Sequence, residues 1–175
     1  MKKDGYQNDE TKGISTFMVL AAWIVGFGFL VAYFSGMLDR KVNPNQIPDS
    51  VISPAGVKVS LKQNTMGHYV TGGEINGERV TFLLDTGATN VSVPSHLASR
   101  LGLQAGRSYR AQTANGTILV ASTVINELKI GDITLRNVSA SINPGMQDQA
   151  ILLGMSALKQ LEWSQRADVL TISTF

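Results

Sequence analysis

One short segment of the sequence has the residue types of a catalytic loop. An apolar run, Val80–Leu84, ends abruptly at Asp85-Thr86-Gly87-Ala88-Thr89, and a second apolar alternation begins at Val91. A carboxylate at the end of a buried strand is costly unless it is hydrogen-bonded. Gly87 permits a tight turn in which backbone N–H groups approach the carboxylate, and the Thr hydroxyls can fix the loop. The segment is thus a candidate for an Asp that works as acid or base, but taken alone it is more often an ordinary turn between two strands.

Two later segments add to this pattern. Residues 107–125 have a hairpin pattern whose turn falls at Ala114-Asn115-Gly116-Thr117, and Asn-Gly is a strong turn signal. Further on, Ile151-Leu152-Leu153-Gly154-Met155 has the composition of a buried strand that runs into a glycine. The sequence thus predicts an acidic loop, then a hairpin with a glycine at its tip, then a buried strand that ends in Leu-Leu-Gly.

This succession resembles the retropepsin-like aspartic protease family, in particular its small membrane-anchored bacterial members. The resemblance covers residues 67–175. It implies that Asp85 is the catalytic aspartate, that the Thr86 hydroxyl locks two active-site loops together across a dimer, and that Gly87 lies beside the catalytic pair. Ala88 and Thr89 complete the loop. Thr89 departs from the viral proteases, which usually carry Asp there, so viral-like substrate contacts are not implied at this position.

The same resemblance implies supporting roles for other segments. Ala114, Asn115, Gly116 and Thr117 correspond to the flap that closes over substrate, and Leu152, Leu153 and Gly154 to the strand that packs under the Asp85 loop. Family members build part of their dimer interface from terminal strands, for which 167–175 is the candidate here. Its alternation of apolar and polar residues also fits an internal strand of the domain.

The chemistry of aspartic proteolysis explains why a dimer is expected. One carboxylate must act as a base that activates water, and one carboxylic acid must protonate the substrate carbonyl oxygen. Two carboxylates in contact do not both ionise easily and therefore share a proton. Because the chain has one Asp-Thr-Gly motif, we predict a homodimer in which Asp85 of each subunit faces one cleft. The predicted substrate is a polypeptide, and the alternative is a silent peptide-binding or scaffolding module on the same fold.

The remaining pattern predicts the elements that position these residues. Val57, Val59 and Leu61 alternate with polar residues, and many further short apolar runs are separated by turn residues. Only two segments, 95–101 and 156–162, have a helical pattern. We therefore expect residues 57–175 to form a mostly β domain with one or two short helices, and the resemblance implies a retropepsin-like closed β-barrel.

The N-terminal third has a different organisation. A short tail, 1–13, precedes the uncharged segment 14–34, which at about 1.5 Å per residue is long enough to cross a bilayer as one transmembrane helix. Residues 35–56 contain three of the five prolines and predict an extended linker, although a short strand within it would also fit. Lys2, Lys3 and Lys12 precede the span and Arg40 and Lys41 follow it, which slightly favours a cytoplasmic N-terminus. We expect a bacterial inner-membrane protein with its protease domain in the periplasm.

Composition excludes several other kinds of site. The chain has no Cys, which rules out disulfides, thiolate catalysis and iron–sulfur sites, and its two His residues leave little material for a metal site. We therefore expect no metal and no cofactor. A net charge of +2 is too small for an electrostatic nucleic-acid binder. The run from Ser156 to Lys159 fits the S-x-x-K pattern of penicillin-binding enzymes, but no accompanying motif supports it.

Overall fold

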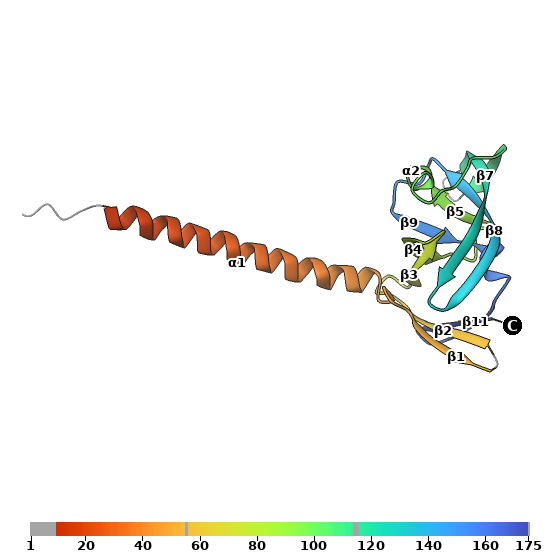
Figure 1. Cartoon of the computed structure of the whole chain (residues 1–175), viewed down its shortest axis with the longest axis horizontal. Coiled ribbons are helices and arrows are strands. Elements are labelled where there is room, and N and C mark those ends of the chain that lie inside the picture. The colour runs from red at the N-terminus through yellow and green to blue at the C-terminus, as the bar shows by residue number, and fades with distance from the viewer. Residues whose placement is uncertain (1–9, 55, 114–115, 175) are drawn as a thin grey trace, which may run out of the picture. The chain divides into compact units, whose positions relative to one another are not determined.

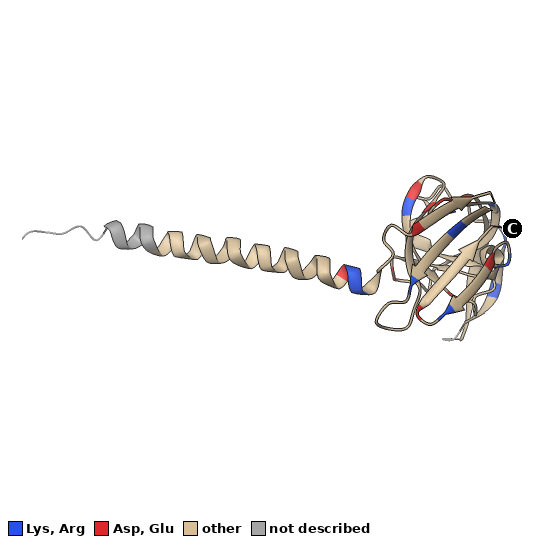
Figure 2. Ribbon diagram, turned by 90° about the horizontal axis from the view of Figure 1, so that it is seen from below, with Lys and Arg blue, Asp and Glu red and all other residues tan. Residues whose placement is uncertain are grey.

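A computed structural model describes residues 10–54, 56–113 and 116–174, and it divides the chain into two compact units, Met1–Asp39 and Arg40–Phe175. Helix α1, Glu10–Val42, is longer at both ends than the predicted span 14–34 (Figure 1). Within it, Thr16–Val42 is long and apolar enough to cross a membrane. No charged residue lies between Thr16 and Leu38, and the charges resume at Asp39 (Figure 2).

The end of α1 has a clear physical cause. Arg40 and Lys41 lie in its last turn, where cations interact favourably with the helix dipole. Asn43 precedes Pro44, and a residue before proline disfavours helical backbone angles. The helix therefore continues past the apolar segment and stops just before the proline.

The second unit is built from short strands, as the alternation of its residues predicts. In chain order its elements are β1 (Asp49–Ser53), β2 (Gly56–Lys62), β3 (Val70–Ile75), β4 (Glu78–Leu84), β5 (Val91–Pro94), α2 (Ser95–Ala98), β6 (Ser108–Thr113), β7 (Gly116–Ile130), β8 (Ile133–Asn143), β9 (Ala150–Leu153), α3 (Met155–Leu158), β10 (Glu162–Arg166) and β11 (Val169–Ser173). The expectation of a mostly β domain with short helices, preceded by one long apolar helix, is confirmed.

Seven strands form the larger sheet, in the order β3-β4-β9-β5-β8-β7-β6. An additional pairing joins β3 to β7 through Glu74↔Lys129 and Ile75↔Leu128, so that six of these strands are linked in a ring. The core of the domain is apolar and includes the fully buried side chains of Phe82, Ile151 and Leu153 from this sheet. Strand β4 pairs in parallel with β9, which places the carboxyl ends of both strands side by side, at Leu84 and Leu153.

The smaller sheet has the order β1-β2-β11-β10. Strand β11 pairs with β2 on one side and with β10 on the other, and Leu170 and Ile172 are buried. The C-terminal strand is therefore an interior strand of its own subunit, so neither of its backbone edges is open to a second chain. Of the two interpretations of residues 167–175, a dimer-interface strand or an internal strand of the domain, this arrangement matches the second.

The predicted linker, 35–56, contains ordered structure. Besides the end of α1 it holds β1, which pairs along its length with β2. Before β1, the buried Asn45 side chain donates to the carbonyls of Lys62 (2.8 Å) and Val70 (2.7 Å) and accepts from the Lys62 N–H (2.7 Å). An amide side chain that satisfies several backbone groups at once fixes this segment to the domain.

Candidate active site

Asp85 follows directly after β4, and backbone hydrogen bonds on both sides hold this point. The N–H of Leu84 donates to the Tyr69 carbonyl (3.0 Å), and the N–H of Asp85 donates to the Leu153 carbonyl (3.2 Å). The chain then turns, and the N–H of Ala88 donates back to the Asp85 carbonyl (3.2 Å). The position of Asp85 is thus defined by the ends of β4 and β9 and by the segment before β3.

The carboxylate is held within its own loop. Its Oδ1 accepts a hydrogen bond from the Gly87 N–H (2.9 Å), and a Cβ at Gly87 would lie 3.1 Å from the same oxygen. Asp85 and Ala88 are half-buried, whereas Thr86, Gly87 and Thr89 are exposed. The close approach of a backbone N–H to the carboxylate is therefore the role that the geometry gives to Gly87.

The segment after β9 lies directly against this loop. The N–H of Met155 donates to the Ala88 carbonyl (2.8 Å), and the N–H of Ser156 donates to the Thr89 carbonyl (2.9 Å). A Cβ at Gly154 would lie 2.6 Å from the Ala88 carbonyl oxygen and would also contact that of Asn90. Only glycine allows this approach of two backbones. The structure thus places Leu153 and Gly154 beside the Asp85 loop, while Leu152 pairs with Leu83 and Ser92.

Ser156 has a structural position that the sequence pattern did not indicate. Its buried Oγ donates to the Ser139 carbonyl (2.6 Å) and accepts from the Val91 N–H (3.0 Å). The hydroxyl is therefore fully used in joining α3 to β5 and β8, at the point where the chain leaves the Asp85 loop. A penicillin-binding type of nucleophile would need this hydroxyl free, so the S-x-x-K match has no support in the geometry.

The hairpin proposed as a flap is formed by β6 and β7. Ala114 and Asn115 lie outside the described residues; Gly116 has φ +108° and pairs with Thr113, and Thr117 donates through Oγ1 to Gln112 Oε1 (2.8 Å). Strand β7 pairs with β6 from Gly116 to Ala121 and with β8 from Ala121 onward. The first part of β7 is therefore bonded to β6 alone, which is the arrangement of a hairpin arm that extends from a sheet.

The base of this arm contacts the Asp85 loop. Asn90, at the end of the loop, donates through Nδ2 to the Tyr109 hydroxyl on β6 (3.3 Å). A Cβ at Gly145 would collide with Ile118 of β7, so the segment after β8 also lies against the arm. Asn90 and Tyr109 were not expected from the sequence, because no spacing rule relates two residues in different strands.

The electrostatics of the site are simple. Within the part of the chain that the structure describes, the Gly87 N–H is the one hydrogen-bond donor to the Asp85 carboxylate and no cation pairs with it. The described ion pairs lie on β7 and β8 instead, where Glu127 contacts Lys129 Nζ (3.0 Å) and Arg136 Nη2 (3.1 Å). No cluster of three metal-ligating side chains occurs among the described residues. The carboxylate is thus available to water and to a partner group.

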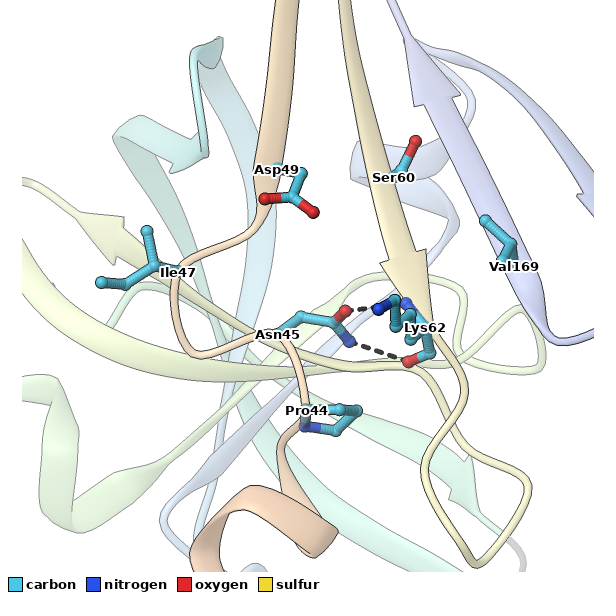
Figure 3. A pocket seen from close by; sticks show the side chains of 7 residues that line it. All are labelled: Pro44, Asn45, Ile47, Asp49, Ser60, Lys62 and Val169. Carbon is cyan, nitrogen blue, oxygen red and sulfur yellow. Dashed lines mark hydrogen bonds between the residues drawn. The ribbon is translucent and has the colours of Figure 1, made fainter.

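A pocket of about 310 Å³ lies elsewhere in the domain (Figure 3). Its lining comes from the segment before β1 and from the smaller sheet: Pro44, Asn45, Ile47, Asp49, Ser60, Lys62 and Val169. Figure 3 shows the Asn45 side chain directed at the backbone of Lys62, to which it is hydrogen-bonded. The amide is fully occupied by structural contacts, so this pocket does not bear on the chemistry of Asp85.

Two proteins of similar sequence are known from bacteria. The uncharacterized protein in the cobV 5′ region of a Sinorhizobium species is 36% identical over 120 residues, which are 66% of this chain and 51% of that protein. An uncharacterized protein of Rickettsia prowazekii is 26% identical over 153 residues, 82% of this chain and 64% of the relative. The chain therefore spans about half the length of the first relative and under two thirds of the second.

Comparison with solved structures supports the fold. The crystal structure of a retropepsin-like aspartic protease from Rickettsia conorii matches with a TM-score of 0.58 and 22% identity, over 73% of this chain and 94% of that one. A model of the family described as gag-polyprotein putative aspartyl protease matches residues 71–160, which include the Asp85 loop, the β6–β7 hairpin and the Gly154 segment. The chain therefore belongs to this family of retropepsin-like aspartic proteases.

Proposed function

We propose that the protein is a membrane-anchored, homodimeric aspartic endopeptidase in which Asp85 of each subunit forms the catalytic pair. The observation that carries the proposal is the state of the Asp85 carboxylate. It lies at the end of β4, in a loop fixed by the Gly87 N–H and by the segment after Gly154, and it has no cation beside it among the described residues. A half-buried carboxylate that is held by one backbone N–H and has no pairing cation can still contact a water molecule and a second carboxyl group, as an acid–base residue must.

The chemistry requires a second copy. One Asp85 carboxylate removes a proton from water, while the other, in its acid form, donates a proton to the carbonyl oxygen of the scissile peptide. Water adds to the carbonyl carbon, and the tetrahedral intermediate breaks its C–N bond as the amine nitrogen takes up a proton. A two-fold axis between two Asp85 loops gives the two groups this geometry from one sequence.

The proposed substrate is an extended polypeptide. The arm of β6 and β7 has an outer edge on β6, because β6 is the last strand of the larger sheet. Extended peptides bind to such edges by main-chain hydrogen bonds, and side-chain pockets then select the sequence. The link from Asn90 to Tyr109 ties the position of this arm to the catalytic loop.

Helix α1 is the proposed anchor, with the N-terminus in the cytoplasm and the domain in the periplasm of the bacterial inner membrane. The support is the length and hydropathy of Thr16–Val42 and the three Lys before the apolar segment against two basic residues after it. A reporter that is active only outside the cytoplasm, fused after Phe175, should be active; an inactive reporter would reverse the orientation.

The test of catalysis replaces Asp85 by Asn in the full chain. Asn keeps the shape and the acceptor oxygen for the Gly87 N–H, so the fold should persist, but it can act neither as base nor as acid. Cleavage of a peptide library should fall by at least about a thousandfold, since general acid–base groups each contribute about 10²–10⁴. Asp132→Asn, an exposed Asp in the β7–β8 turn, is the matched control and should cleave normally.

The dependence of wild-type cleavage on pH is a second test of the catalytic pair. Because one carboxyl group of the pair must be protonated and the other ionised, wild-type cleavage should be fastest at mildly acidic pH and decline on both sides. Undiminished cleavage by Asp85→Asn would end the assignment. Peptide binding by the wild-type protein without any cleavage would instead favour the silent peptide-binding module.

A further inference from the structure

Strand β10 leaves one whole backbone edge of the smaller sheet open. It is the last strand in the order β1-β2-β11-β10, and all five of its residues, Glu162 to Arg166, are exposed. No described residue bonds to its outer edge. An open edge with free N–H and C=O groups is a template for pairing with another strand.

The hydrogen bonds of β11 show which groups of β10 lie on that edge. The N–H of Thr174 donates to Val57 (3.0 Å), and the carbonyl of Asp168 accepts from Gln63 (2.8 Å), so the even-numbered residues of β11 face β2. Since backbone groups alternate along a strand, its odd-numbered residues face β10 and pair there with Arg166, Ser164 and Glu162. The backbone groups of Trp163 and Gln165 therefore point to the open edge.

The sequence of β10 is self-complementary. In an antiparallel pair of two copies centred on Ser164, each Glu162 lies opposite Arg166 of the second copy, and each Trp163 lies opposite Gln165. The outward backbone groups of Trp163 and Gln165 can then exchange hydrogen bonds across the two-fold axis. Glu162, Ser164 and Arg166 form the non-hydrogen-bonded pairs, in which opposite Cα atoms are closest, about 4.5 Å apart.

We infer that β10 is the dimer seam: two copies join their β10 edges about a two-fold axis at Ser164, and the two smaller sheets become one sheet of eight strands. The inference rests on the proposed function, because the catalytic pair is incomplete without a second copy. The inference assigns the contact to β10 and not to the C-terminal strand β11, because β11 lies between β2 and β10 within its own subunit.

The other open edge of this sheet has no such complementarity. In an antiparallel pair of two β1 strands centred on Val51, the charged Asp49 lies opposite the neutral Ser53. The ion pairs of the β10 seam contribute more to register than to affinity, since exposed pairs are weak. A register shift by one residue would move Glu162 away from Arg166. It would also set the outward backbone groups of Trp163 and Gln165 opposite groups of the second copy that are already bonded to its β11.

A cysteine at the axis tests the seam directly, because the chain contains no Cys. Ser164→Cys in the full chain, in detergent micelles, would bring two copies of the new thiol to a Cα separation of about 4.5 Å, within the range of about 4.4–6.8 Å that disulfides span. Oxidation should convert most of the protein to a covalent dimer. Ser108→Cys, an exposed strand position on β6, is the matched control and should remain uncrosslinked.

Charge reversal tests the register. Glu162→Arg alone and Arg166→Glu alone place like charges opposite each other in a homodimer, so each variant should show a weaker dimer by sedimentation at low salt. An equimolar mixture of the two variants should regain the wild-type dimer fraction, because in the mixed dimer both cross-strand pairs again join opposite charges. Arg79→Glu, an exposed charge on β4, controls for net charge.

The outcomes separate this inference from the proposed function. Efficient crosslinking at Ser164→Cys and recovery in the mixture support the seam even if no peptide is cleaved. A chain that sediments as a dimer and cleaves peptide, but in which Ser164→Cys crosslinks no better than Ser108→Cys, overturns the seam and leaves the protease intact. Equal dimer fractions for the single reversals and their mixture also overturn it.

Discussion

At the scale of single residues, Gly154 controls the position of Asp85 although it has no side chain. Three backbone segments meet at this glycine: the end of β9, the Asp85 loop and the start of β5. The Met155 and Ser156 N–H groups bond to the loop carbonyls only because the backbone at Gly154 comes so near. A backbone oxygen cannot rotate away from an added methyl group as a flexible side chain could. Any substitution at Gly154 must therefore displace the backbone of the Asp85 loop.

Gly154→Ala should therefore lower stability and cleavage together. The new Cβ would lie 2.6 Å from the Ala88 carbonyl oxygen, and overpacking of this kind costs about 1–3 kcal/mol. Displacement of the loop should also reduce kcat, whereas KM should change less. Gly77→Ala is the control: it also adds a methyl group, at φ +85° but into open space, and should lose some stability with normal cleavage per folded molecule. Normal stability in Gly154→Ala would contradict the steric argument.

The candidate site could be predicted from sequence where its residues are neighbours in the chain. The contact between Asp85 and Gly87 spans two positions and is visible as a motif. Ser156 could not be found in this way, because its partners Val91 and Ser139 are brought together only by the parallel pairing of β5 with β8. A short-range pattern has no information on such a pairing, so no sign of the structural role of this hydroxyl is visible in the sequence.

At the scale of elements, alternation predicts that a strand exists but does not say which strands neighbour it. Residues 167–175 have the alternation of a strand, and β11 is one, yet its two edges are filled by β2 and β10. Strand β1 was only the second interpretation of residues 35–56, for a different reason. Prolines at 44, 48 and 54 surround it and indicate a linker, while its pairing with β2 overrides that local signal.

The charged cluster on β7 and β8 gives a prediction at this scale. The hydrogen bond from Lys129, with the charges of Lys129 and Arg136, holds the pKa of Glu127 below its ordinary value. A carboxyl group with a lowered pKa stabilises the fold above its unfolded pKa, and this contribution is lost as the pH falls through the folded pKa. The reciprocal effect raises the pKa of Lys129.

Glu127→Gln should therefore lower the melting temperature at neutral pH, and the difference from wild type should shrink as the pH falls below the ordinary range of a Glu carboxyl group. The measurement is a series of thermal unfolding curves from pH 7 to pH 3. Glu78→Gln, an exposed Glu on β4 outside the described ion pairs, is the control and should follow the wild type at each pH. A constant difference across this range would contradict the electrostatic explanation.

At the scale of the whole molecule, the boundary between anchor and domain differs from the one that composition suggests. The apolar segment and the change in texture at Val57 are both plain in the sequence. However, the second compact unit begins at Arg40, because Asn45 and β1 are bonded into the domain. A polar side chain that bonds to backbone groups far along the chain leaves no mark in composition, so this contribution of the segment before Val57 could not be predicted from the sequence.

Truncation decides between the two boundaries. A chain that begins at Val57 loses β1 and the Asn45 amide, and with that amide three hydrogen bonds to Lys62 and Val70, each of which contributes about 0.5–1.5 kcal/mol. We expect residues 40–175 to unfold in one cooperative thermal transition and residues 57–175 to unfold at a clearly lower temperature. Asn45→Ala in the longer piece isolates the amide from the loss of β1 and should produce part of the same decrease. Equal melting temperatures for the two pieces would show that the segment before Val57 is the linker that its prolines suggest.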